Sequence, residues 1–584
     1  MRSKMSLLAA TATVSLAQAA SLADVCTSTY ASAAAPISPL LGVTVDQSSV
    51  TANAVYNYTS SETAFWTAAT FDFCNVTLSY THDGLDDTVL LEFWLPAPSD
   101  FQNRWLSTGG FGYAINGNSA DLPGGVMYGA ASGQTDGGFG GFSVEFDDVY
   151  LLANGTADRE ALYMFGYQAH HELSVIGKAF TKSFFNLTSS GDKLYAYYQG
   201  CSEGGREGWS QVQRYGEEWD GAVIGAPAIR YGQQQPNHLF PGLVEQTMGY
   251  FPPPCELEKI NNLTIAACDE LDGKKDGVVS RTDLCKLHFD VNSTIGEPYY
   301  CAAETTTTVL KKRLSTSNTT PAQNGTVSKA GAAVAAAILD GLHTLDGKRA
   351  YIWYQPSATF DDAATQYNSE TDSWELDITS LGGEWVTKWL ELVDLDNLST
   401  LDNVTYDVMK DWMELGWQRY EDVLQTTWPD LTPFYSAGGK VLHVHGESDP
   451  SIPTGSSVHY HEAVRQQMYP SLSFNESSEA LNDWNRLYLV PGAAHCTYSS
   501  DQPNGGWPQT TLLTLIDWVE NGDKPDLLNA TVQEGSNIGQ QQKLCPWPHR
   551  PLFVNNGTEL TCVFDEESYQ TWVYDFDAYN LPLY

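Results

Sequence analysis

Short β-prone apolar runs that alternate with helical segments constrain the fold of this chain more than any other feature. The runs predicted to form strands are 88–95, 193–199, 221–225, 440–446 and 486–490. Residues 161–185 show the apolar spacing of a helix, and 454–468 are predicted to form another. This alternation favours an α/β fold, in which helices cover both faces of a mostly parallel sheet.

The alternation breaks between residues 228 and 432. This stretch contains four of the ten cysteines, long polar loops and Trp-rich helices. We therefore expect an inserted lid domain, and an α/β domain built from residues 20–227 and 433–584. Inside the insertion, 304–325 is a Ser/Thr/Asn-rich segment without periodicity, and it contains the basic cluster Lys311-Lys312-Arg313. An exposed polar loop of this kind is where proteases cut.

The composition is that of a strongly acidic globular protein. The chain has 584 residues, of which 42% are hydrophobic and 17% are charged, and its net charge is −41. A disordered chain would carry fewer aromatic and more charged residues. So large a negative charge repels phosphate backbones and anionic lipid surfaces, which argues against a nucleic-acid or membrane partner.

The first nineteen residues predict a secreted, extracellular protein. Arg2 and Lys4 precede a short apolar stretch, 5–16, and Ala17-Gln18-Ala19 has the small-x-small pattern of a cleavage site. No other stretch approaches the ~20 apolar residues of a membrane anchor. In an oxidising compartment the even number of cysteines, 10, predicts five disulfides.

Sequons for N-glycosylation are frequent, and after a signal peptide they favour a glycoprotein. They begin at Asn57, Asn75, Asn154, Asn186, Asn262, Asn292, Asn318, Asn324, Asn397, Asn403, Asn475, Asn529 and Asn556.

The segment 200–204, Gly-Cys-Ser-Glu-Gly, matches the G-x-S-x-G pattern of a serine nucleophile. It follows a predicted strand and opens a predicted helix, which is the required context. The small residues allow a tight turn that exposes Ser202. The backbone N–H of Glu203 is then placed to stabilise an oxyanion, and we expect a second donor from Gly109 or Gly110 in the earlier glycine-rich loop.

A serine nucleophile needs a base and a carboxylate that orients the base. In this class of fold the chain order is serine, acid, histidine. His495 directly follows the predicted strand 486–490, and Asp449 lies at the usual distance beyond 440–446. Glu447 is the rival acid.

Two cysteines adjoin the predicted nucleophile and base. Cys201 precedes Ser202, and Cys496 follows His495. If the serine and the histidine meet, their neighbours come within the ~4.4–6.8 Å between Cα atoms that a disulfide spans. We therefore predict a Cys201–Cys496 bond that holds the base against the nucleophile.

These motifs together resemble the fungal tannase and feruloyl esterase family of α/β-hydrolases. The resemblance rests on Gly-Cys-Ser-x-Gly-Gly-Arg at 200–206, followed by Asp449 and by His495-Cys496. It spans nearly the whole chain after residue 19. It implies a secreted serine esterase with an α/β-hydrolase fold and an inserted lid that recognises a phenolic acyl group. The expected substrate is a galloyl ester or depside bond of hydrolysable tannins, with release of gallic acid through an acyl-enzyme.

Two alternatives stay open. The first is a feruloyl esterase, which would act on hydroxycinnamoyl esters of plant cell-wall polysaccharides. The second is a catalytically inactive secreted binding protein of the same fold.

The resemblance also implies processing of the precursor. In tannases of this kind a dibasic protease leaves two disulfide-linked chains, and Lys312-Arg313 is the matching position. Lys348-Arg349 is a weaker alternative.

An acidic, glycine-containing loop at 268–278 predicts a structural Ca²⁺ site. Hard oxygen ligands on a tightly turned loop suit this ion, and the spacing is not that of an EF-hand. By the resemblance, the ligands are the carboxylates of Asp269, Asp272 and Asp276 and the backbone carbonyls of Lys274 and Val278. A metal-free acidic turn is the alternative.

The remaining cysteine pairs are expected partly by elimination. They are Cys268–Cys285, which closes the acidic loop, and Cys26–Cys74, Cys255–Cys301 and Cys545–Cys562.

Other conspicuous residues are expected to have no special role, and for the tryptophans core packing is favoured over the alternative of an aromatic substrate pocket. These are Trp385, Trp389, Trp412 and Trp417 in the insertion, and the alternating His443 and His445 on a strand.

Overall fold

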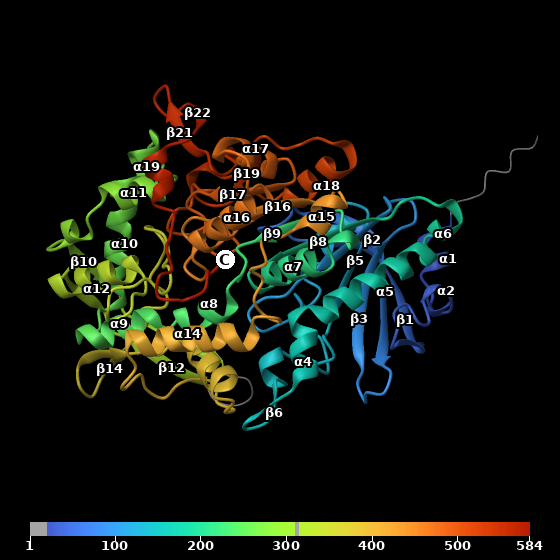
Figure 1. Ribbon diagram of the computed structural model, residues 1–584, viewed down its shortest axis with the longest axis horizontal. Helices are drawn as coiled ribbons and strands as arrows, with labels where there is room; N and C mark the ends of the chain where they lie inside the picture. Colours follow the sequence, from blue (N-terminus) through green and yellow to red (C-terminus); the bar gives the residue numbers. More distant parts are fainter. Residues whose placement is uncertain (1–19, 310–314) are drawn as a thin grey trace, which may run out of the picture.

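The computed structural model describes residues 20–309 and 315–584 (Figure 1). The predicted signal peptide and the Lys312-Arg313 pair lie outside these residues. Among the described residues, no helix combines the length and the apolar character that crossing a bilayer requires.

A nine-stranded sheet forms the centre of the molecule. In spatial order its strands are β1 (Val43–Ser60), β2 (Ala69–His82), β3 (Val89–Pro96), β5 (Ala130–Thr135), β4 (Arg104–Thr108), β8 (Tyr195–Cys201), β9 (Gly221–Gly225), β16 (Lys440–Gly446) and β17 (Asn485–Val490). The strands from β5 to β17 run parallel to one another, whereas β1, β2 and β3 pair antiparallel. The predicted α/β class is confirmed.

Helices cover both faces of this sheet, because successive side chains of a strand point to opposite sides. On β8, Tyr198 packs with Trp209 of α7 (Glu203–Arg214) in the largest apolar cluster, to which α5 (Ala169–Phe184) also contributes. Its neighbour Tyr197 packs on the other face with Leu515 of α18 (Thr511–Asn521). The buried parallel strands are apolar on both faces for this reason.

The antiparallel edge of the sheet was not predicted from the sequence. β1 and β2 are long, and β1 is rich in Ser, Thr and Asn, with few buried residues along its length. A strand that faces solvent along most of its length lacks the apolar run by which the parallel strands were recognised.

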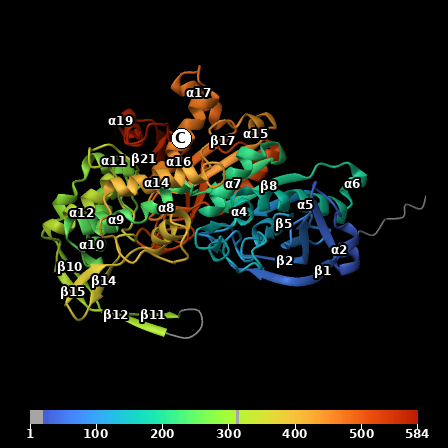
Figure 2. The same cartoon turned by 60° about the horizontal axis from the view of Figure 1, so that its bottom comes forward.

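The insertion forms a helical body beside the sheet, as Figures 1 and 2 show. Its main helices are α8 (Tyr231–Asn237), α9 (Phe240–Met248), α10 (Pro254–Cys268), α11 (Thr282–His288), α12 (Lys329–Asp340) and α14 (Tyr406–Tyr420). The segment that was predicted to be irregular contains the paired strands β11 (Glu304–Val309) and β12 (Ser315–Thr320), which project from this body in Figure 2. Threonine-rich segments have high β propensity, which the absence of apolar periodicity concealed.

The C-terminal segment packs against the insertion. In both views α19 (Glu566–Gln570) lies beside α11. Lys286 Nζ donates to the Tyr574 hydroxyl at 2.7 Å, and the Arg349 N–H donates to Asp577 at 2.7 Å. The end of the chain therefore joins the lid to the α/β domain.

All ten cysteines are paired as predicted. The bonds are Cys26–Cys74, Cys201–Cys496, Cys255–Cys301, Cys268–Cys285 and Cys545–Cys562.

Most sequon asparagines lie at the surface, as glycosylation requires. Exposed are Asn57, Asn154, Asn186, Asn262, Asn292, Asn324, Asn403, Asn475, Asn529 and Asn556. Asn75 and Asn397 are half-buried, and their side-chain nitrogens donate to Glu92 and to the Ile378 carbonyl, respectively. The side chain of Asn318 is outside the described part.

A charged cluster ties the end of β2 to α5. His82 lies with Nδ1 2.5 Å from Asp87 Oδ2 and with Nε2 3.0 Å from Glu172 Oε1. The hydrogen bond with Glu172, aided by Asp87, outweighs burial and raises the pKa of His82 to about 9.

This cluster predicts a pH-dependent stability. The folded-state pKa of His82 exceeds the ordinary value of 6.5, so its contribution is complete below about pH 6.5 and is lost as the pH rises towards 9. We expect the free energy of unfolding to fall over this interval in the wild type and to fall less in His82→Gln. Urea unfolding across the interval measures both curves, and parallel curves would contradict the assignment.

Candidate active site

Ser202 occupies the sharp turn between β8 and α7. Its backbone has φ 66° and ψ −121°, a positive φ that residues other than glycine rarely adopt. The Ser202 N–H donates to the Gly225 carbonyl at 3.1 Å, which fixes the turn against β9. The residue therefore has the strained strand-to-helix geometry that presents a nucleophile at the positive end of a helix.

Close backbone contact explains the glycines around this turn. A Cβ atom on Gly204 would lie 2.8 Å from the Gly110 oxygen, and one on Gly200 would lie 2.5 Å from the Gly204 oxygen. The Gly204 N–H donates to the Gly110 carbonyl at 3.0 Å. The loop after β4 can lie directly against the nucleophile turn only because these side chains are absent.

His495 and Asp449 meet as predicted. His495 Nδ1 lies 2.8 Å from Asp449 Oδ2, and the N–H groups of Ser451 and Ile452 donate to Asp449 Oδ1 at 2.8 and 2.9 Å. Asp449 follows β16 and is fully buried, whereas His495 follows β17 and is partly exposed. The contact through Nδ1 leaves Nε2 as the ring nitrogen that can serve Ser202.

The environment keeps Asp449 ionised. Burial alone would raise its pKa, but the charge of His495 and the hydrogen bonds with His445 and His495 hold the pKa well below the ordinary value. An ionised, buried carboxylate is what orients a catalytic imidazole and stabilises its protonated form.

His445 contacts the predicted acid, so the expectation that it has no special role is wrong. Its Nε2 lies 3.1 Å from Asp449 Oδ2, and its Nδ1 lies 2.7 Å from Ser457 Oγ. His443, two residues earlier, reaches the same hydroxyl at 2.8 Å. The sequence position of His445 could have suggested this contact, because His445 lies at the end of the strand that precedes Asp449, four residues before it.

The rival acid, Glu447, serves another purpose. Its Oε2 accepts hydrogen bonds from Thr282 of the lid at 2.7 Å and from Arg550 of the C-terminal segment at 2.6 Å. Glu447 is fully buried, and the guanidinium group of Arg550 offsets the charge of its carboxylate. It therefore joins three segments of the chain, and Asp449 is the carboxylate beside His495.

The Cys201–Cys496 bond joins the nucleophile turn to the histidine loop. The two Cα atoms are 6.1 Å apart although 295 positions separate them in the sequence. Ser202 and His495 line one cavity, as do both cysteines. The predicted bond and the expected convergence of the two loops are confirmed.

The cavity beside Ser202 has a volume of about 430 Å³, within the usual range for a small-molecule site. Its apolar and aromatic walls are Phe65, Trp66, Phe111 and Leu381. Leu381 comes from the lid, whereas the two residues at 65–66 come from the connection between β1 and β2. Asp121 and His495 are the ionisable residues among the described residues that line it.

The tryptophans singled out in the sequence, Trp385, Trp389, Trp412 and Trp417, lie outside this lining. Trp385 and Trp389 are fully buried and stack on each other, so the packing role predicted for them is confirmed. Trp412 and Trp417 pack against the same core.

The expected second oxyanion donor is contradicted. The Gly109 N–H donates to the Gln199 carbonyl at 3.2 Å, and the Gly110 N–H donates to Glu207 Oε2 at 2.9 Å. A buried carboxylate needs donors, and the glycine loop supplies one to Glu207. The N–H of Glu203 remains the predicted donor, because the first residue of a helix has no intrahelical acceptor.

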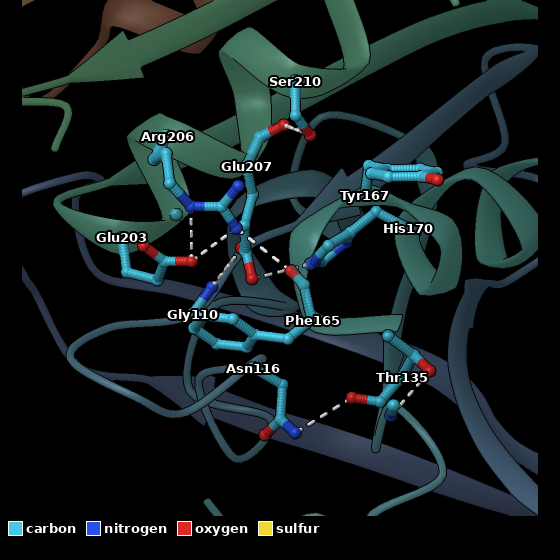
Figure 3. A network of polar contacts seen from close by, with 12 residues as sticks. Gly110, Asn116, Thr135, Phe165, Tyr167, His170, Glu203, Arg206, Glu207 and Ser210 are labelled. Carbon is cyan, nitrogen blue, oxygen red and sulfur yellow. Dashed lines mark hydrogen bonds and ion pairs between the residues drawn. The ribbon is translucent and has the colours of Figure 1, made fainter. Parts of the chain in front are cut away.

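Figure 3 shows the buried network behind the nucleophile helix. Glu207 lies between Gly110 and His170, whose Nε2 is 3.0 Å from Glu207 Oε1. The side chain of Glu203 is buried and accepts from Arg206 Nε at 2.7 Å, while Arg206 also donates to the Phe165 carbonyl at 3.0 Å. The network fixes α7 and the glycine loop relative to each other.

Comparison with known proteins agrees with this site. Residues 74–568 match the family described as "Tannase and feruloyl esterase". The chain belongs to the tannase and feruloyl esterase family. It is therefore a carboxylic ester hydrolase of the α/β-hydrolase fold.

Relatives of this esterase cover nearly its whole length. The chain is 53% identical to a tannase from Aspergillus oryzae over 97% of both chains. A tannin acyl hydrolase from Aspergillus niger has 57% identity and a TM-score of 0.92, covering 97% of this chain and 99% of the other. A probable feruloyl esterase from Arthroderma benhamiae is 29% identical, over 85% of this chain and 86% of the relative.

The acidic loop of this esterase lies against its histidine loop. The Val279 N–H donates to Gln502 Oε1 at 2.8 Å, and Asn504 Nδ2 donates to the Asp276 carbonyl at 2.8 Å. Gln502 also donates to Ser448 Oγ at 2.7 Å, next to Asp449 in the chain. The loop thus contacts the segment that follows His495 and is linked through Gln502 to Ser448, the residue before Asp449.

The contact between His445 and Asp449 predicts a role in positioning the acid. We expect His445→Leu to lower kcat for p-nitrophenyl acetate about tenfold, because a hydrogen bond to a charged group is worth about 1.5–3 kcal/mol. His443→Leu is the matched control, since that residue is equally buried and shares Ser457 without touching Asp449. Equal losses in both variants would show that the effect is only structural.

Proposed function

We propose that this protein is a secreted serine esterase that hydrolyses galloyl ester and depside bonds of hydrolysable tannins and releases gallic acid. The observation that carries the proposal is the shared cavity of Ser202 and His495, with Asp449 hydrogen-bonded behind the imidazole. Residues in this order along the chain form the catalytic triad of the α/β-hydrolase fold.

The three residues have distinct roles in the proposed reaction. Ser202 Oγ attacks the ester carbonyl while His495 Nε2 removes its proton, and the imidazolium then gives that proton to the leaving alcohol. The Glu203 N–H stabilises the oxyanion, aided by the positive end of α7. Water, activated by His495, attacks the acyl-enzyme in the same manner and releases the acid.

The galloyl preference is supported by similarity over the whole chain. Identity is 53% and 57% to the two tannases but 29% to the feruloyl esterase. Feruloyl ester hydrolysis is the second candidate, because the catalytic motifs are shared within the family. An inactive binding protein is disfavoured, since it has no need of a complete triad.

Two measurements test this function. We expect kcat/KM to be higher for methyl gallate than for methyl ferulate, and we expect Ser202→Ala to reduce both by about 10⁴-fold or more without changing the fold. Circular dichroism and the unfolding midpoint check the fold of the variant. A faster reaction with methyl ferulate would favour the second candidate, and an active Ser202→Ala would refute the triad.

Processing is proposed at Lys312-Arg313, between β11 and β12. A cut there would place Ser202 on one chain and Asp449 with His495 on the other. Of the five disulfides, Cys201–Cys496 is the one that spans this position, so it would join the two chains beside the active site.

We further propose that the acidic loop holds a structural Ca²⁺ ion. The chemistry of the side chains suits this ion, because Asp269, Asp272 and Asp276 offer hard oxygen ligands on one loop, although their carboxylate oxygens do not all lie within 4.8 Å of one another and would have to draw together around the ion. Lys274 Nζ lies 2.6 Å from Asp276 Oδ2, so the ion would replace this ammonium group. The carbonyls of Lys274 and Val278 complete the proposed ligands. The ion would brace the loop that supports His495.

Removal of calcium tests this site. We expect a chelator to lower the thermal unfolding midpoint of the wild type, and we expect Asp272→Asn to abolish that response, because a bound ion stabilises only the folded state. Glu270→Gln is the matched control, since Glu270 is exposed in the same loop and pairs with Lys275. An unchanged midpoint in the chelated wild type would leave the loop as a metal-free acidic turn.

A further inference from the structure

An unpaired carboxyl group lies in the wall of the catalytic cavity. Asp121 lines this cavity together with Ser202 and His495. No hydrogen bond or ion pair joins its side chain to any residue that the structure describes. Asp121 is partly exposed to the open cavity, where water can reach its oxygens, so a ligand that fills the cavity must supply a donor in place of that water.

Among the residues that the structure describes, no lysine or arginine lines the cavity with Asp121. The apolar walls of the cavity are Phe65, Trp66, Phe111 and Leu381, and burial raises the pKa of Asp121 to about 7. The one other ionisable residue in the lining is His495, whose Nδ1 is already bound to Asp449. No described side chain that lines the cavity therefore offers a free positive charge to offset that of an ionised Asp121.

The glycine at position 117 leaves room for the carboxyl group of Asp121. A Cβ atom on Gly117 would lie 2.3 Å from Asp121 Oδ2. The carboxyl thus rests on backbone that has no side chain, directly before the short helix α3 (Pro123–Val126). Any residue larger than glycine at position 117 would displace this oxygen.

We propose that Asp121 is a specificity residue that accepts hydrogen bonds from adjacent phenolic hydroxyl groups of the acyl part of the substrate. A carboxylate offers two acceptor oxygens, and neighbouring hydroxyls on one ring offer two donors. The aromatic walls hold the ring, and Asp121 selects rings that carry free hydroxyls over rings in which these are methylated. This inference rests on the proposed esterase function and names how the same cavity recognises its acyl group.

The test uses binding probes that do not need to be substrates. Pyrogallol and 1,2,3-trimethoxybenzene have the same ring and oxygens, but only pyrogallol donates hydrogen bonds. Each is measured as a competitive inhibitor of p-nitrophenyl acetate hydrolysis. At about pH 8, where a carboxyl group with a pKa of about 7 is mostly ionised, we expect wild-type protein to bind pyrogallol at least about tenfold more tightly, in line with hydrogen bonds to a charged group.

The variants Asp121→Asn and Asp121→Ala should reduce this preference to about twofold or less. The readout is the ratio of two inhibition constants in one protein, so a general loss of activity cancels. Asp100→Asn, an exposed aspartate outside the cavity, should keep the wild-type ratio. The KM for methyl gallate should rise in the Asp121 variants more than kcat falls.

Several results would overturn the proposal. One is a wild-type protein that does not prefer pyrogallol, which requires no variant to observe. Another is an unchanged ratio in both Asp121 variants. Benzylamine binding as tightly as pyrogallol would instead indicate a site for cations. Failure of the wild type to hydrolyse methyl gallate would refute the galloyl function separately, while the pyrogallol ratio would still test Asp121.

Discussion

The disulfide between Cys201 and Cys496 is the constraint on which the active site depends. It joins two loops that are 295 positions apart, and the two cysteines are the direct neighbours of Ser202 and His495, the proposed nucleophile and base. The other four bonds lie within the N-terminal part, the insertion or the C-terminal part. This one therefore connects the two halves of the α/β domain across the insertion and limits how far Ser202 and His495 can separate.

Buried polar contacts extend this constraint to the lid. Glu447 binds Thr282 of the insertion and Arg550 of the C-terminal segment, and Gln502 links Val279 to Ser448. Because removing one partner of a buried charge is strongly destabilising, these segments cannot move independently of the acid loop without a large cost. The insertion thus supports the catalytic residues as well as adding Leu381 to the wall of their cavity.

Much of the central sheet could be predicted because the parallel strands are buried on both faces. The runs at 221–225 and 440–446 coincide with β9 and β16, and Ser202, Asp449 and His495 each follow a predicted strand. β1 was missed because it alternates little and faces solvent. The roles of His445 and Asp121 were missed because each depends on a contact or a cavity formed by distant segments.

The sequence by itself determined the fold class and the order of the candidate nucleophile, acid and base along the chain. These follow from local patterns, since a strand, a tight turn and a helix each leave a signature in neighbouring residues. Only the tertiary structure decided that Glu447 is a buried cross-link, that Gly110 donates to Glu207, and that Asp121 lines the cavity beside Ser202 with no side-chain hydrogen bond to another described residue. The reason is physical: whether a polar group is satisfied, and by what, depends on atoms that chain folding brings together from far apart in the sequence.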